Sequence, residues 1–171
     1  MNLEHSKKST TEYKTVNKAI KSYAEQLNKI STYKVESRGV TYSSFLKDKM
    51  LIILAIRNGI PYNLFNKIKD LTPFSEDEWA NFLSLSKKTL YRHSNEVDYV
   101  FKPIHSEKII EIAEVIDYGK EVFDTTEQFY LWLSTPSFAL GNLKPSELLK
   151  NSYGKEMVKS ELTKIENGIF A

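Results

Sequence analysis

Apolar residues recur at every third or fourth position along nearly all of this 171-residue sequence, and no stretch alternates apolar and polar residues for more than a few positions. That spacing is the period of an amphipathic α-helix and not of a β-strand. The sequence therefore predicts an all-α fold. Near the N-terminus the apolar residues form a stripe with steps of three and four: Tyr13, Val16, Ile20, Tyr23, Leu27 and Ile30.

This stripe needs an apolar surface to cover it. Roughly two to three heptads are too few for a stable coiled coil by themselves. Three interpretations stay open: the helix packs against the body of its own chain, forms a dimer contact, or folds only when it binds a partner. We expect residues 1–10 to form a frayed tail and residues 32–42 to form a linker or a short extended piece.

The composition limits the chemistry that the chain can perform. It has no cysteine, which excludes disulfides and thiolate-ligated metal sites and leaves His5, His93 and His105 as the imidazole ligands. The sequence has no Gly-rich phosphate loop and no nucleophile motif, and its histidines have no helical spacing. We therefore expect no catalytic residue, no metal site and no cofactor, and we predict that the protein is not an enzyme.

The sequence also indicates where the protein works. Its longest strictly apolar run, residues 50–56, is far shorter than the roughly 20 residues of a membrane-spanning helix. The first residues are rich in Lys and Ser and have no apolar core of a secretory leader. We expect a cytoplasmic protein with no membrane contact.

The net charge of +2 results from a cancellation. Residues 1–105 carry 17 Lys and Arg against 11 Asp and Glu, a net of +6, whereas residues 106–171 carry 7 against 11, a net of −4. A basic part suits a polyanion, and an acidic part suits a protein partner or simply keeps the chain soluble. The alternative is that both parts are ordinary solvated helix faces.

Helix signals continue through the basic part. We expect one helix from an N-cap at Ser43 or Ser44 to a stop at Asn58-Gly59, because glycine commonly ends a helix. Pro61 then opens a helix over residues 62–71, which ends before Pro73.

The next segment predicts two short helices joined by a tight turn. Ser75 and Glu78 have the spacing of a capping box, and Ser86 is a second N-cap before residues 87–93. We expect Trp79 and Leu90 to be core residues. Such a pair is typical of a helix-turn-helix, whose second helix reads the major groove. The predicted contacts to phosphates and bases are Ser86, Lys87, Lys88, Thr89, Tyr91 and Arg92.

Two points bear on this interpretation. The alternative is a capped helix pair that has an exposed basic face and does not bind DNA. The turn also carries Ser84 at a position often held by glycine, so it must be reached by other geometry, or the motif is weakened as a DNA reader.

The acidic part predicts four further helices. Ser106 is expected to cap the first, Thr125 and Gln128 form a capping box for the second, and Pro145 starts a third. The last helix covers residues 155–166 and ends at Asn167-Gly168. Two segments are unusually apolar for their positions: the loop 137–143, and residues 169–171 after the last helix. Phe170 either folds back onto its own domain or inserts into a partner.

Here the residues carry a family resemblance. The segments "LSKKTLYRH", "EVFDTTEQFYLWLSTPSFALGNLKPSELL" and "GKEMVKSELTKIENGIFA" resemble the Xre/MbcA/ParS antitoxins over residues 45–171. The most specific part is an ordered series: Trp132-Leu133, Pro136, Leu140-Gly141, Pro145, Leu149, Gly154, Val158, Leu162 and Gly168. The sequence departs from the family at Ser84, and at Asn142, where the family pattern usually has glycine. Asn tolerates a left-handed backbone, so the loop is retained.

The resemblance implies an antitoxin that neutralises a RES-domain, NAD-consuming toxin by covering its active site. It also implies a homodimer that represses its own operon by binding operator DNA. It implies an Xre-like helix-turn-helix domain (43–105) and a toxin-binding domain (106–171). We predict that residues 1–42, which lie outside the resemblance, form an N-terminal extension with an amphipathic helix. The implied toxin contacts are Phe138, Leu140, Gly141, Asn142, Leu143, Asn167, Gly168, Ile169, Phe170 and Ala171. The competing interpretation is a helix-turn-helix regulator whose C-terminal domain senses a ligand or a protein.

Overall fold

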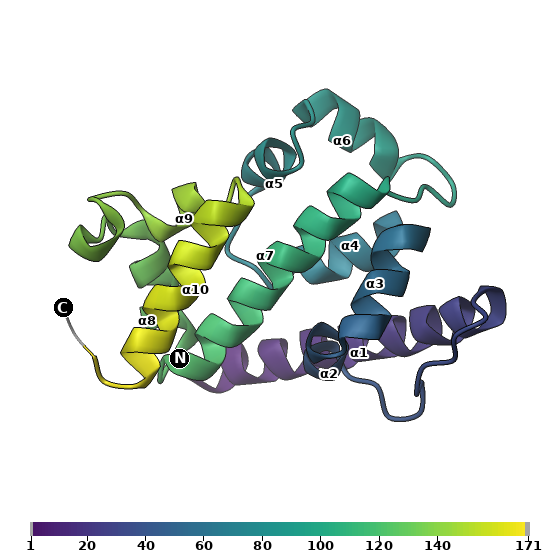
Figure 1. Cartoon of the computed structure of the whole chain (residues 1–171), viewed down its shortest axis with the longest axis horizontal. Helices are drawn as coiled ribbons and strands as arrows, with labels where there is room; N and C mark the ends of the chain where they lie inside the picture. Colours follow the sequence, from purple (N-terminus) through teal and green to yellow (C-terminus); the bar gives the residue numbers. More distant parts are fainter. Residues whose placement is uncertain (1, 170–171) are drawn as a thin grey trace. The chain divides into compact units, whose positions relative to one another are not determined.

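The computed structural model describes residues 2–169, and it describes the side chains of residue 11 and of residues 13–169. Over this range the chain is all-α: helices joined by short loops, with two isolated β-bridges and no strand (Figure 1). The predicted fold class is confirmed. The chain divides into two compact units, residues 1–110 and 111–171, and each is described separately.

Over residues 2–110, the first unit contains six helices and the start of a seventh. They are α1 (Asn2–Ile30), α2 (Tyr42–Lys47), α3 (Lys49–Asn58), α4 (Tyr62–Lys69), α5 (Glu76–Phe82), α6 (Lys87–Ser94) and the first part of α7 (Pro103–Val122). The second unit contains the rest of α7, α8 (Thr126–Ser134), the short 3₁₀ helix η1 (Phe138–Leu140), α9 (Pro145–Leu148) and α10 (Ser152–Glu166). Within the described residues, no helix is long and apolar enough to cross a membrane.

The stripe of α1 packs against the chain itself. Val16, Ile20, Tyr23 and Leu27 are buried, and α1 contacts α2, α3 and α4. The Tyr23 hydroxyl donates a hydrogen bond to the carbonyl oxygen of Gly59 over 2.6 Å. Of the three interpretations of the stripe, the structure shows the first, although Ile30 at its end is exposed.

The expectation of a frayed tail over residues 1–10 is wrong for the described backbone, because α1 already begins at Asn2. Once a helix is nucleated, each further residue adds a hydrogen bond at little cost, so the anchored part of α1 extends toward the N-terminus.

The single helix expected from Ser43 or Ser44 to Asn58 is in fact two. Thr41 is the N-cap of α2, and it forms a capping box with Ser44. The backbone then turns at Asp48, whose carboxylate accepts hydrogen bonds from the amides of Met50 and Leu51, each over 3.0 Å, and starts α3. The predicted stop at Gly59 is confirmed.

The expected N-cap at Ser106 is also wrong. Helix α7 begins at Pro103, and Ser106 lies inside it, fully buried. Its hydroxyl donates to the carbonyl oxygen of Phe101 and accepts from the amide of Ile60 over 2.9 Å. Ser106 therefore ties the start of α7 to the chain that leads into α4.

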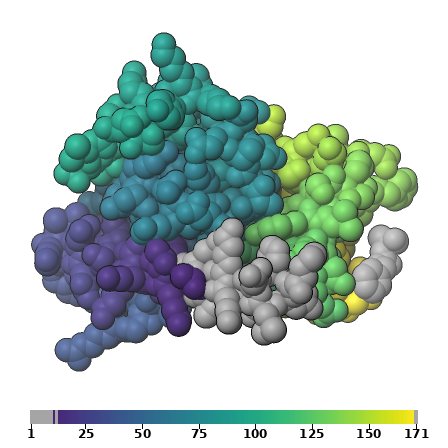
Figure 2. All heavy atoms as spheres, turned by 180° about the vertical axis from the view of Figure 1, so that it is seen from behind, coloured from purple at the N-terminus to yellow at the C-terminus, as the bar shows by residue number. Residues whose placement is uncertain are grey.

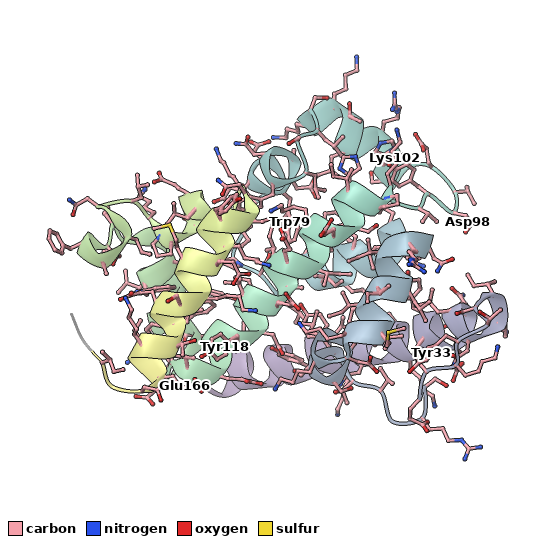
Figure 3. All side chains as sticks on the ribbon, in the orientation of Figure 1. Tyr33, Trp79, Asp98, Lys102, Tyr118 and Glu166 are labelled. Carbon is pink, nitrogen blue, oxygen red and sulfur yellow. The ribbon has the colours of Figure 1, made fainter. Side chains whose placement is uncertain are left out.

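An aromatic cluster forms the core of the first unit. Trp79 on α5, which is labelled in Figure 3, is completely buried. It meets Phe65, Phe74 and Phe82 edge to face, and Phe65 meets Phe101 in the same way. The expected burial of Trp79 and Leu90 is confirmed. Through these two side chains, α5 and α6 are both anchored in the core of the first unit.

The second unit has a smaller core, and one close helix contact shapes it. Its buried apolar side chains are Ile112, Ala113, Val115, Ile116, Phe129, Leu133, Leu140, Leu149, Val158 and Leu162. Helices α9 and α10 pack together where Gly154 passes the backbone of Leu148. In this unit α7 and α10 are linked by Glu111, which pairs with Lys155 at 3.3 Å and accepts from the Ser152 hydroxyl at 2.9 Å.

Candidate functional site

Helices α5 and α6 have the form of the predicted helix-turn-helix. Ser75 and Glu78 make the capping box of α5, and the Ser86 hydroxyl caps α6 by accepting from the Thr89 amide over 3.0 Å. Between them Ser84 adopts a left-handed backbone with φ of 53°. The turn therefore keeps the conformation that glycine would favour, with a serine in its place.

Two of the three cations predicted to contact DNA lie beside carboxylates of the first unit. The ammonium group of Lys87 lies 2.9 Å from the carboxylate of Asp77 on α5, and this contact raises the pKa of Lys87. The guanidinium of Arg92 lies 3.3 Å from the carboxylate of Glu96. Lys88 is exposed, and the described residues offer it no ion pair. The predicted DNA contacts thus share one helix, but two of their three cations have acidic neighbours.

The basic excess of the first unit lies outside the helix-turn-helix. Residues 75–105 carry 4 Lys and Arg against 5 Asp and Glu, a net of −1, whereas residues 1–74 carry 13 against 6, a net of +7. On α1, Lys14, Lys18 and Lys21 share one exposed face, and within the described residues they form no ion pair. Figure 2 shows the described part of α1, in purple, at the molecular surface.

The second candidate surface includes the loop 137–143 of the second unit. Its ends are joined by a hydrogen bond from the Ser137 amide to the Leu143 carbonyl oxygen over 3.1 Å. Gly141 and Asn142 both have a left-handed backbone, with φ of 70° and 61°, so Asn142 adopts the conformation expected of a glycine. The loop is therefore a closed and internally hydrogen-bonded structure.

The apolar side chains of this loop point in different directions, one into the core and two toward solvent. Leu140 is 3% exposed and anchors the loop in the core, whereas Phe138 is 88% exposed and Leu143 is half-exposed. Of the predicted toxin contacts, Leu140 is thus a core residue, while Phe138 and Leu143 face solvent. Leu131 on α8 is also 68% exposed, and sequence reasoning missed it because its helical position does not show which face is free.

The segment after α10 is a further segment of the second unit that the sequence predicted to contact a toxin. Gly168 has a φ of 68°, and the amides of Gly168 and Ile169 donate to the carbonyl oxygens of Ile165 and Lys164 over 3.0 and 2.8 Å. Ile169 is 59% exposed. The predicted contacts Phe170 and Ala171 lie outside the described residues. η1 packs against α10, so the loop and this segment belong to neighbouring elements of one unit.

A shallow hollow of about 480 Å³ lies in the first unit, between α1, the start of α4 and the loop after α6. It is lined by tyrosines and polar groups that include Tyr62, Tyr99, Gln26 and Glu96. No sequence motif pointed to it. Within the described residues, no group of three or more His, Asp and Glu side chains could hold a metal ion.

Comparisons with known proteins bear on the second unit. Residues 119–168 match the family model described as the antitoxin Xre/MbcA/ParS C-terminal toxin-binding domain. This match confirms the resemblance that the motifs suggested, over the segment that it covers. The chain is also similar to a chain of the crystal structure of the M. tuberculosis MbcT-MbcA toxin-antitoxin complex, with a TM-score of 0.49 at 19% identity, over 63% of this chain and 94% of that chain. No curated protein sequence matches the chain.

Proposed function

We propose that the protein is an antitoxin whose second unit binds and neutralises a toxin. The observation that carries this proposal is the family match, because residues 119–168 lie within the compact unit 111–171. That unit also contains both segments with exposed apolar side chains that the sequence assigned to toxin binding. The proposed toxin is a RES-domain enzyme that consumes NAD and is encoded beside the antitoxin.

The surface of the second unit supports a protein partner. Its exposed large apolar side chains are Leu131, Phe138, Leu143, Tyr153, Met157 and Ile169. A single exposed leucine needs no explanation, but a phenylalanine held 88% exposed on a closed loop fits the aromatic anchors of protein interfaces. Because η1 and its hydrogen bonds fix this loop, little conformational entropy is lost when Phe138 enters a pocket.

Neutralisation of this kind needs no chemistry from the antitoxin. The second unit would cover the entrance to the toxin's NAD site, with Phe138 and the segment after α10 as the main contacts. Substrate is then excluded sterically, and the strength of inhibition follows the affinity of the complex. The acidic balance of the unit would set the encounter rate with a basic toxin surface.

Co-expression with the RES-domain protein encoded next to it tests the proposal. The wild-type chain should protect cells and co-purify with that protein. The variant Phe138→Ala should weaken the complex by about 2 kcal/mol, or roughly 30-fold, as loss of an interface anchor does. Val97→Ala is the matched control, because Val97 is 91% exposed but belongs to the first unit. If the wild-type chain neither binds nor protects, the proposed function is wrong.

A second proposed activity is repression of the operon by a cytoplasmic homodimer that binds operator DNA. The geometry of α5, Ser84 and α6 favours it, since a recognition helix follows a tight turn as in a DNA reader. The ion pairs of Lys87 and Arg92 weigh against tight binding by this helix alone. Because the stripe of α1 is buried, the dimer would have to use another surface. The alternative function, a regulator that senses a ligand or protein through its C-terminal domain, predicts DNA binding without toxin neutralisation.

A further inference from the structure

A tyrosine of α7 connects to the last turn of α10 in the second unit. The Tyr118 hydroxyl donates to the Glu166 carboxylate over 2.7 Å and lies 3.1 Å from the Thr163 hydroxyl. Figure 3 shows Tyr118 and Glu166 side by side at the end of α10. Burial, followed by the hydrogen bond to Glu166, raises the pKa of Tyr118 above its ordinary value.

The chain leaves α10 in one defined direction. Two backbone hydrogen bonds, from the Ile169 amide to the Lys164 carbonyl oxygen and from the Gly168 amide to the Ile165 carbonyl oxygen, form a Schellman motif around the left-handed Gly168. The side-chain amide of Asn167 adds a bond to the Thr163 carbonyl oxygen over 2.7 Å. The carbonyl oxygen of Thr163 thus accepts a hydrogen bond from Asn167, and its hydroxyl lies beside the hydroxyl of Tyr118.

Leu162 is the last fully buried residue of α10. Lys164 and Ile165 are half-buried, whereas Thr163, Glu166, Asn167 and Ile169 are exposed. The ends of helices open at little cost when no packing holds them. The hydrogen bonds of Tyr118 are side-chain contacts from another helix to this last turn, so they act on the part of α10 beyond its last fully buried residue.

We propose that Tyr118 is a positioning residue for toxin binding: it fixes the last turn of α10, and thereby the direction in which residues 167–169 leave the helix. This inference rests on the proposed function, because it assigns toxin contact to that segment. The segment is held in place before binding, so the complex does not lose that ordering entropy when it forms.

The experiment uses the full chain and compares Tyr118→Phe with the wild type. Tyr33→Phe is the matched control, because Tyr33 is an exposed tyrosine of the first unit. The variants Glu166→Ala and Glu166→Gln form a second pair, since glutamine keeps a hydrogen-bond acceptor for Tyr118 and alanine does not. The first readout is the NMR order parameter of the Gly168 and Ile169 amides, with the Leu162 amide as an internal reference. The second is the affinity for the RES-domain protein encoded beside the antitoxin.

For Tyr118→Phe and Glu166→Ala we expect the order parameters of the Gly168 and Ile169 amides to fall from about 0.85, the value of a rigid backbone, to below about 0.6. The order parameter of the Leu162 amide should not change. Affinity for the RES-domain protein should weaken ~5-fold, as expected for one net hydrogen bond. Glu166→Gln and Tyr33→Phe should behave like the wild type.

Unchanged order parameters in Tyr118→Phe overturn the inference. A loss of order that leaves the affinity unchanged also overturns the inference, because Tyr118 then fixes the last turn of α10 without affecting toxin binding. If the wild-type chain itself does not bind the RES-domain protein, the proposed function fails, and the order parameters alone then decide whether Tyr118 holds the turn.

Discussion

The carbonyl oxygen of Leu148 occupies the place where a side chain on residue 154 would have to go: a Cβ atom added to Gly154 would lie 2.0 Å from it. Gly154 is buried in the first turn of α10, and the oxygen belongs to the end of α9. The absence of a side chain is therefore what lets α9 and α10 approach so closely.

Gly154→Ala should destabilise the second unit. In an open helix this substitution stabilises by about 1 kcal/mol, because alanine is the better helix former. Here the clash is with backbone, which cannot move aside cheaply, and we expect a net loss of about 1–3 kcal/mol, as in overpacked cores. Thermal unfolding measures it, with Ser160→Ala on the exposed face of α10 as control. A stabilised Gly154→Ala variant would show that the two helices are farther apart.

Glu111→Gln should also destabilise the second unit. The side chains of Glu111 and Lys155 are only 11% and 14% exposed, so loss of the carboxylate leaves a poorly hydrated ammonium group. We expect a cost of about 1–3 kcal/mol, in the range for hydrogen bonds to charged groups. Glu156→Gln is the matched control, because it removes the other partner of Lys155, which is 66% exposed, and should cost less than about 0.5 kcal/mol. Equal effects of the two variants would contradict this view.

His105 should make the stability of the first unit depend on pH. Burial, and then the charge of Lys102, lower the pKa of His105 below 6.5. The unfolded chain therefore binds a proton more readily than the folded one, and stability should fall as the pH drops through about 6.5 toward the folded pKa. Urea unfolding at several pH values between about 7.5 and 5.5 measures this slope. His105→Gln should flatten it, and a variant that keeps the full slope would assign the dependence to other groups.

The salt dependence of DNA binding should show which part of the first unit contacts the DNA phosphates. One triple variant replaces Lys87, Lys88 and Arg92 by alanine, and a matched one replaces Lys14, Lys18 and Lys21. If α6 reads DNA, the first variant should lower the slope of log affinity against log salt by about 0.9 for each lost phosphate contact, while the second leaves it nearly unchanged. Fluorescence anisotropy with operator duplex measures both. The reverse result would move the DNA surface to α1, and no binding by the wild type would leave α5 and α6 as a structural pair.

Local signals in the sequence predicted much of the fold. The capping box at Ser75, the cap at Ser86 and the stop at Gly59 all depend on neighbouring residues, and the structure confirms each of them. The break at Asp48 was hidden, because the apolar period continues across it. Ser106 was misread as a cap because its partner, the amide of Ile60, is 46 residues away in the sequence.

The sequence also predicted which segments form the candidate site, but not which of their side chains face solvent. Motif spacing identified the loop 137–143 and the segment after α10, but it did not show that Leu140 points into the core while Phe138 faces solvent. The ion pair of Asp77 with Lys87, and the bond of Tyr118 to Glu166, join residues on different helices. Such contacts depend on how helices pack, which residue spacing does not encode.

Removal of residues 167–171 tests whether the segment after α10 neutralises the toxin. The measurement is survival of cells that express the neighbouring RES-domain toxin together with either the full chain or the chain shortened after Glu166. Circular dichroism and thermal unfolding of the shortened chain show that it is folded. We expect the folded, shortened chain to lose most of its protection. Full protection by the shortened chain would contradict the assignment of toxin neutralisation to this segment.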